Sequence, residues 1–347
     1  MKKTVTRLAD GRELIYYDTR DGTPRTAADP RPLAPVASRS EIRLDELTGD
    51  HVAVASHRQT RTHLPPADAC PLCPARPGHE SEIPGDGYEV AVFENRFPAL
   101  SGGAGRCEVV CFTDDHTASF ADLTEERARL VLDAWTDRTA DLSALPGVEQ
   151  VYCFENRGRE IGVTLPHAHG QVYALPYTTP RTALTLRRLD EHRRATGRNL
   201  FDDVVARERA DGARMVLETD DWAAFVPYAA RWPYEVHLHP LRRVPDLTAL
   251  DAAARTALPQ VYLELLRRFD RIFGPAEPPT PYIAAWHQAP VADARREEFG
   301  LHLELFTVRR ASGKLKFLAG TESGMGAFMN DVRPEDAARR IREVAEA

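Results

Sequence analysis

The segment Pro166-His167-Ala168-His169-Gly170-Gln171 holds the side chains with the clearest capacity for chemistry. Alternate side chains of a β-strand share one face, so an expected strand over 167–175 places His167, His169 and Gln171 together. A neutral imidazole can attack phosphorus, and Gly170 leaves room for a phosphate group. The Gln171 amide can donate to phosphoryl oxygens. The plain alternative is a pair of ordinary strand histidines.

A second feature is the pair Cys70 and Cys73, which are separated by two residues. Two thiolates on a tight turn can both reach one metal ion, and the spacing favours zinc. No second pair of this spacing occurs, so His116 and His167, at the ends of expected strands, are the natural further ligands. A redox pair or two incidental thiols is the alternative. The other cysteines lie in apolar runs and are expected to be small core residues: Cys107, Cys111 and Cys153.

Two polar segments are suited to hold a nucleotide near the histidines. The loop over 154–158, followed by Gly162 to Thr164, precedes the histidine strand and is expected to face phosphate and ribose. Arg58 and Arg61 carry the charge needed to neutralise a diphosphate. Each residue alone is more often a solvated surface residue, so the hypothesis depends on their joint occurrence.

Hydrophobic patterning predicts the elements that position these residues. Short strands are expected over 51–55, 88–93, 107–112 and 151–154, with a helix after Asp122-Leu123-Thr124-Glu125. The second half repeats this order: Glu108-Val109 then Asp122-Leu123-Thr124 is echoed by Glu235-Val236 then Asp246-Leu247-Thr248, about 125 residues later. We therefore expect an α+β fold built by internal duplication, with an antiparallel sheet and flanking helices.

Composition limits the class of protein. The 347 residues have a net charge of -7, which argues against a nucleic-acid binder, and 43% are hydrophobic, enough for a large core. Residues 1–40 are expected to be a polar arm, 41–180 a catalytic half with the metal site, and 181–347 a second half with a closing helix. Five cysteines, no signal-like start and no long apolar run predict a cytoplasmic protein without a membrane segment.

Together these motifs resemble the galactose-1-phosphate uridylyltransferases, a branch of the histidine-triad superfamily whose subunit holds two related halves. The resemblance covers about 43–344. Its further marks are Val92 to Leu100, Asp115-His116, Arg231-Trp232-Pro233, Trp286-His287 and Lys316 to Gly320.

The resemblance implies an enzyme, a nucleotidyltransferase of galactose metabolism that exchanges UMP between UDP-glucose and galactose-1-phosphate by a ping-pong reaction. His169 would attack the α-phosphorus and carry a uridylyl group, with Gln171 and Thr164 at the phosphoryl oxygens. The implied zinc ligands are Cys70, Cys73, His116 and His167. The implied substrate-binding residues are Arg58, Arg61, Asn95, Asn156, Lys316 and Glu322. A homodimer is expected, because members of the family borrow residues from the partner subunit.

Two departures from the family pattern stand out. Some relatives hold a second, iron-type site with one Glu and three His. Here His287 and His302 match, but Glu304 stands at the third His and Thr185 at the Glu, so that site is not predicted. Thr321 stands where several relatives have an aromatic residue, which leaves the sugar preference open.

Two other functions fit the same motifs. An adenine-nucleotide transferase or phosphorylase of the same superfamily would share the His-x-His-x-Gln strand. A non-catalytic binding protein stabilised by zinc would use both histidines as structural residues. A plain histidine-triad hydrolase fits less well, because it would have a third His in place of Gln171.

Overall fold

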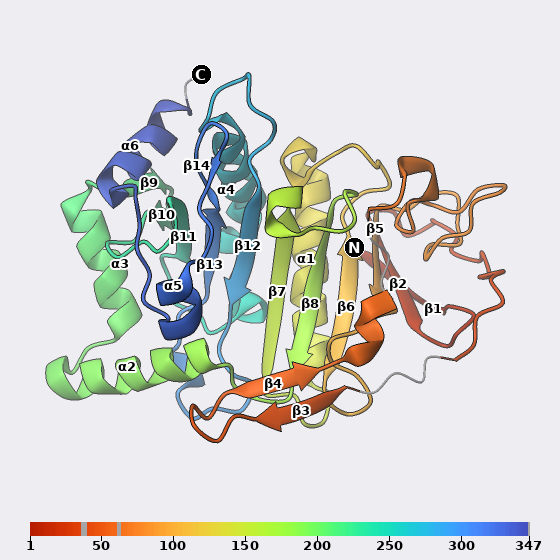
Figure 1. The fold of residues 1–347 in the computed structure, drawn as a ribbon, viewed down its shortest axis with the longest axis horizontal. Coiled ribbons are helices and arrows are strands. Elements are labelled where there is room, and N and C mark those ends of the chain that lie inside the picture. Colours follow the sequence, from red (N-terminus) through yellow and green to blue (C-terminus); the bar gives the residue numbers. More distant parts are fainter. Residues whose placement is uncertain (36–39, 61–63, 346–347) are drawn as a thin grey trace. The chain divides into compact units, whose positions relative to one another are not determined.

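The computed structural model describes residues 1–35, 40–60 and 64–345. They form two compact units, and both are drawn in Figure 1. The first unit contains 1–153, 164–184 and 290–293, and the second contains 154–163, 185–289 and 294–347. Antiparallel strand pairs and packed helices occur in both units, which confirms the predicted α+β class.

The first unit is built on a sheet with the strand order β1-β2-β5-β6-β8-β7. The pairs β1–β2, β2–β5, β5–β6 and β6–β8 are antiparallel. A separate hairpin, β3–β4, packs the half-buried Ile42 and Ala53 beside Leu100 and Cys107. The strands are β1 (Lys2–Arg7), β2 (Glu13–Asp18), β3 (Glu41–Leu44), β4 (His51–Val54), β5 (Val90–Glu94), β6 (Arg106–Cys111), β7 (Gln150–Arg157) and β8 (His169–Leu175).

One long helix, α1 (Glu125–Ser143), covers one face of this sheet. The Thr124 side chain caps the helix by accepting from the Arg127 N–H. Arg138 of α1 donates to the buried Glu108 on β6, so Glu108 faces the helix. Because strand side chains alternate, Val109 and its cross-strand partner Gln171 face the opposite side, which α1 does not cover.

The second unit contains a sheet with the strand order β12-β13-β11-β10-β9. Its long helix α4 contacts the sheet through Trp222, whose indole N–H donates to the Ala254 carbonyl at 2.9 Å. The strands are β9 (Met215–Glu218), β10 (Trp222–Phe225), β11 (Tyr234–Pro240), β12 (Tyr282–His287), β13 (His302–Thr307), β14 (Arg309–Ala311) and β15 (Lys314–Leu315). The helices are α3 (Leu200–Asp211), α4 (Ala252–Arg271), α5 (Gly320–Met325) and α6 (Pro334–Glu343), and α2 (Pro180–Thr196) is shared between the units.

The strand order confirms the internal duplication. In the first unit the order β5-β6-β8-β7 has α1 inserted between β6 and β7, and in the second the order β10-β11-β13-β12 has α4 inserted between β11 and β12. The repeated sequence motif, however, does not place Glu108 and Glu235 at equivalent positions in the two units. Glu108 faces α1, whereas Glu235 lies on the face opposite α4 and accepts from His237.

The structure differs from the expected polar arm over 1–40. β1 and β2 form a hairpin, and β2 pairs with β5 in the main sheet. The run from Leu14 to Tyr17 is buried and supplies core side chains, so the β1–β2 hairpin is an integral part of the first unit. The hairpin has few apolar residues, and those of β2 pack against β5 and α1.

A further difference concerns the histidine strand. It was expected to begin at His167, but β8 begins at His169 and His167 lies in the preceding loop. Within the described residues, none of the helices is both long enough and apolar enough to cross a membrane.

Candidate active site and metal centre

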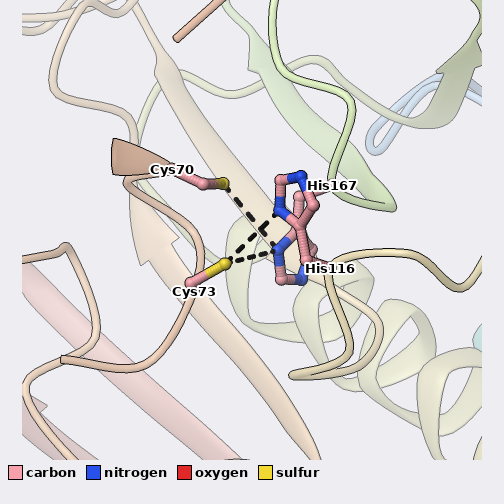
Figure 2. A group of neighbouring side chains, drawn as sticks. All are labelled: Cys70, Cys73, His116 and His167. Carbon is pink, nitrogen blue, oxygen red and sulfur yellow. Dashed lines mark hydrogen bonds between the residues drawn. The ribbon is translucent and has the colours of Figure 1, made fainter. Parts of the chain in front are cut away.

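Four predicted ligands from three separate loops lie together in the first unit (Figure 2). Cys73 donates its backbone N–H to the Cys70 carbonyl, and this tight turn places both sulfurs on one side. His116 follows β6 and His167 precedes β8. Because these two strands pair antiparallel, both imidazoles lie at the same end of the strand pair. All four ligand atoms lie within 4.8 Å of one another.

The distances in this group are those of atoms around a common centre. The Cys73 sulfur lies 3.4 Å from His116 Nδ1 and 3.5 Å from His167 Nδ1, and the Cys70 sulfur lies 3.8 Å from His167 Nδ1. A tetrahedral zinc ion with ordinary Zn–S and Zn–N bonds separates sulfur and nitrogen by about 3.5 Å. The residues therefore fit a zinc ion.

The hydrogen bonds of His167 prepare its ring for metal binding. Nε2 lies 2.7 Å from the Thr113 carbonyl oxygen, which only accepts, so Nε2 carries the hydrogen. Nδ1 then presents its lone pair to the two sulfurs. The Tyr88 hydroxyl lies 3.0 Å from Nε2 and itself donates to the Leu72 carbonyl. Burial lowers the pKa of His167 to about 4, so the ring is neutral.

The predicted nucleophile, His169, is oriented by the same segment. Its Nδ1 donates to the His167 carbonyl oxygen at 2.7 Å, which leaves the lone pair on Nε2. Burial lowers the pKa of His169 below its ordinary value, so the ring stays unprotonated at neutral pH. The half-buried side chain lies on the sheet face that α1 leaves uncovered.

Two further residues of β8 extend this face, and Arg58 lies beside them. Gln171 and Tyr173 follow His169 at alternate positions, and the Tyr173 hydroxyl donates to Gln171 Oε1 at 3.2 Å. That bond turns the Gln171 amide N–H groups away from Tyr173. The Arg58 guanidinium, on the short helix Ser56–Thr60, lies beside the Tyr173 hydroxyl and opposes the rise that burial causes in the pKa of Tyr173.

A cavity of 340 Å³ lies on the same face of the first unit. Phe93, Phe97 and Leu72 give it apolar walls, and Val109 joins it to β8, because Val109 pairs with Gln171. Asn95 lines the cavity and accepts the Phe97 N–H at its Oδ1, which leaves its amide N–H groups to donate. Aromatic walls with one directed amide suit a planar base.

The remaining predicted residues are placed less directly. Thr164 lies in the loop before β8, where its carbonyl accepts from the Leu64 N–H. Asn156 on β7 belongs to the second unit. So do Lys316 and Glu322, which form a buried ion pair at 2.9 Å. Arg61 lies outside the described residues.

Sequence reasoning missed several residues of the first unit. Tyr173 holds Gln171, Tyr88 lies against His167, and Phe97 and Val109 line the cavity. A signal existed for Tyr173, because it lies four residues after His169 on the same strand face. Tyr88 and Val109 reach the site through strand pairing, which no local pattern shows.

Comparison with known proteins identifies the class and then the family. The chain is an enzyme, a nucleotidyltransferase. Residues 101–179 match the model of the galactose-1-phosphate uridyl transferase N-terminal domain, and 185–347 match that of the C-terminal domain. Since these matches cover more than half of the chain, it belongs to the galactose-1-phosphate uridylyltransferase family, which confirms the resemblance.

Individual relatives agree with this family. A galactose-1-phosphate uridylyltransferase of Streptomyces lividans is 61% identical over 100% of this chain and 99% of its own length. One of Thermotoga maritima is 32% identical over 87% of this chain and 98% of its own length. A solved uridylyltransferase structure, 31% identical, has a TM-score of 0.77 and covers 88% of this chain and 98% of that chain.

Proposed function

We propose that this protein transfers a uridylyl group between UDP-glucose and galactose-1-phosphate, with His169 as the covalent carrier. Membership of the family supports the substrates, because the relatives are named for galactose-1-phosphate and uridylyl transfer. The observation that carries the chemistry is the hydrogen bond from His169 Nδ1 to the His167 carbonyl, which directs the lone pair to Nε2.

The proposed first step balances as a simple displacement. The Nε2 lone pair of His169 attacks the α-phosphorus of UDP-glucose, a nitrogen–phosphorus bond forms, and the bond from that phosphorus to the bridging oxygen breaks. Glucose-1-phosphate leaves with the electron pair of the broken bond. In the second step a phosphate oxygen of galactose-1-phosphate attacks the same phosphorus, and the pair returns to Nε2. The two half-reactions form a ping-pong cycle.

The neighbouring residues are assigned supporting roles. The Gln171 amide, turned outward by Tyr173, would donate to the phosphoryl oxygens, and Thr164 would lie beside them. Arg58 would offset the charge of the diphosphate. We assign Asn95 and its cavity to the nucleoside, and Asn156, Lys316, Glu322 and Arg61 to substrate binding on the family pattern.

Zinc, when bound by Cys70, Cys73, His116 and His167, would have a structural role and would fix the position of the loop before β8. That loop includes the His167 carbonyl, which sets the tautomer of His169. We also propose a homodimer on the family pattern; an interface between subunits would cover exposed apolar side chains such as Phe317 and Met325, which are 77% and 82% exposed. Light scattering coupled to gel filtration tests this state.

Intact-mass measurement tests the proposed carrier directly. Mixing the protein with UDP-glucose should add the mass of one UMP, and galactose-1-phosphate should then remove it and release UDP-galactose. The His169→Asn variant should fold and take no label. A mass gain from ADP-glucose, but not from UDP-glucose, would instead assign the adenine branch. Label exchange by His169→Asn would rule out this nucleophile.

A further inference from the structure

A short segment near the N-terminus, 29–33, borders the cavity that we assign to the nucleoside. Arg31, Pro32 and Leu33 are among the residues that line this cavity of 340 Å³. The segment precedes the part of the chain that resembles the family, which covers about 43–344. The motifs that carry the resemblance therefore assign no role to these three residues.

Prolines restrict the backbone of this segment. Pro30 and Pro32 have nearly fixed φ angles, and each disfavours the helical conformation in the residue before it. Asp29 and Arg31 are those preceding residues, and the segment has no helical turn. The Leu33 N–H donates to the Arg31 carbonyl at 2.9 Å. A segment restricted in this way loses little conformational freedom when a ligand packs against it.

The Arg31 guanidinium fixes the segment to the loop that precedes β5. Nε and Nη2 donate to the two carboxylate oxygens of Asp29, each at 2.8 Å. Nη1 lies 3.1 Å from Glu82 Oε1, and Nη2 also donates to Glu82 Oε2 at 3.2 Å. All three nitrogens of the buried guanidinium are thus engaged by carboxylates. Arg31 therefore holds the segment in place and does not itself need to contact a ligand.

Glu82 is held in turn by a second buried arginine. Arg12, which precedes β2, lies with Nη2 2.5 Å from Glu82 Oε2, and its Nη1 donates to the Glu94 carbonyl at 2.8 Å. Buried charges of opposite sign are costly to separate, because each would stay desolvated without a partner. Glu94 ends β5 and precedes Asn95. The two arginines therefore fix the segment 29–33 with respect to Asn95, the residue assigned to the nucleoside.

Pro32 and Leu33 give the segment an apolar surface at the cavity. Pro32 is exposed and Leu33 is half-buried, so both can lose contact with water when a ligand fills the cavity. The cavity residues Leu72 and Phe93 belong to the buried core of the first unit. Apolar side chains from the segment and from the core thus line one cavity, as expected for a site that takes a planar base.

We propose that 29–33 is a fixed wall of the nucleoside site, in which Pro32 and Leu33 contact the nucleoside and Arg31 is the positioning residue. This inference rests on the proposed function, which assigns the cavity to the nucleoside. The nucleoside does not react, so its contact with the wall is equal in the bound substrate and in the transition state. Loss of the wall should therefore raise KM for UDP-glucose and leave kcat unchanged.

An introduced thiol tests the contact directly. The five native cysteines are buried, so alkylation of Leu33→Cys by iodoacetamide reports on position 33. Saturating UMP should slow this alkylation at least severalfold. Val5→Cys is the matched control, because Val5 is 54% exposed on β1 and does not line the cavity. Its alkylation should not respond to UMP. Equal alkylation rates of Leu33→Cys with and without saturating UMP would overturn the contact.

Calorimetric titration with UMP tests the contribution to affinity. Leu33→Ala should weaken UMP binding about three- to tenfold. Arg31→Gln should weaken it at least as much, and Arg31→Lys should recover part of the affinity. Arg25→Gln is the matched control, because Arg25 forms a comparable ion pair with Asp18 at 2.5 Å and does not line the cavity. It should bind UMP as the wild type does.

The outcomes separate the wall from the proposed transfer. Unchanged UMP affinity in folded Leu33→Ala would overturn the wall. An equal loss of affinity in Arg25→Gln and Arg31→Gln would overturn the positioning role of Arg31. Wild-type protein that binds UMP but takes no label from UDP-glucose would overturn the transfer and leave the wall in place. Wild-type protein that binds no UMP would overturn both.

Discussion

The backbone carbonyl of His167 accepts a hydrogen bond from His169 Nδ1 at 2.7 Å, while the His167 side chain lies among the metal-ligand sulfurs. One residue thus belongs to the metal centre through its ring and to the proposed reaction through its backbone. The proposed zinc site and the proposed nucleophile are therefore linked through His167, whose ring contacts the Cys73 sulfur and whose carbonyl accepts from the His169 ring.

The neutral state of His169 predicts a particular pH dependence. Burial lowers its pKa below the ordinary value of about 6.5, so the nucleophilic neutral ring persists to more acidic pH. The rate of adduct formation in a single turnover should therefore decline only below pH 6.5. Rapid-quench measurement of UMP labelling across pH checks this. An acidic limb centred at or above 6.5 would contradict the assigned environment.

Gln171 is expected to act mainly on the transition state. Replacing it by Ala removes the amide donors proposed for the phosphoryl oxygens, and adduct formation should slow by about 10² to 10³. The metal content should not change. Tyr173→Phe is the matched partner, since it removes only the hydroxyl that orients Gln171. Its effect should be smaller, and an equal loss in both variants would argue against the direct role of Gln171.

The proposed metal ligands were largely predictable from the sequence. Cys70 and Cys73 were predicted as ligands because only two residues separate them, and a tight turn brings both sulfurs together. His116 and His167 were natural additions because each lies at the end of a strand, and antiparallel pairing of β6 and β8 brings these ends together. The structure confirms that the four side chains cluster, and zinc stays a prediction.

Other features depend on contacts that no local pattern contains. β2 gains its place in the sheet by pairing with β5, more than 70 residues away, so the buried run from Leu14 to Tyr17 was read as part of an arm. Glu108 and Glu235 matched in sequence, yet they face opposite ways relative to their helices. A one-residue difference in register reverses the face of a strand side chain, and sequence similarity alone does not report it.

Cys70→Ser tests the structural contribution of the metal centre. A metal that binds only the folded protein stabilises it, so loss of a ligand should reduce bound zinc and lower the free energy of unfolding by about 4 kcal/mol or more. Metal analysis and denaturant unfolding check both effects. Cys107→Ala is the control, because Cys107 is a buried core thiol outside the ligand group. It should retain the metal and cost about 1 kcal/mol. Unchanged zinc in Cys70→Ser would remove this residue from the ligand set.

Glu155 on β7 predicts a pH dependence of stability in the second unit. Burial raises its pKa from an ordinary 4.5 to about 7, against the lowering effect of Arg157. The folded state thus binds the proton more tightly than the unfolded state. The stabilisation by this proton is therefore complete below pH 4.5 and is lost as the pH rises to about 7. This loss lowers the free energy of unfolding by about 3 kcal/mol. Glu155→Gln keeps the shape without the ionisation, and its unfolding free energy should lack this decline. Denaturant unfolding at pH 4.5, 6 and 8 measures the effect. Parallel pH curves for the two proteins would show that Glu155 ionises without penalty.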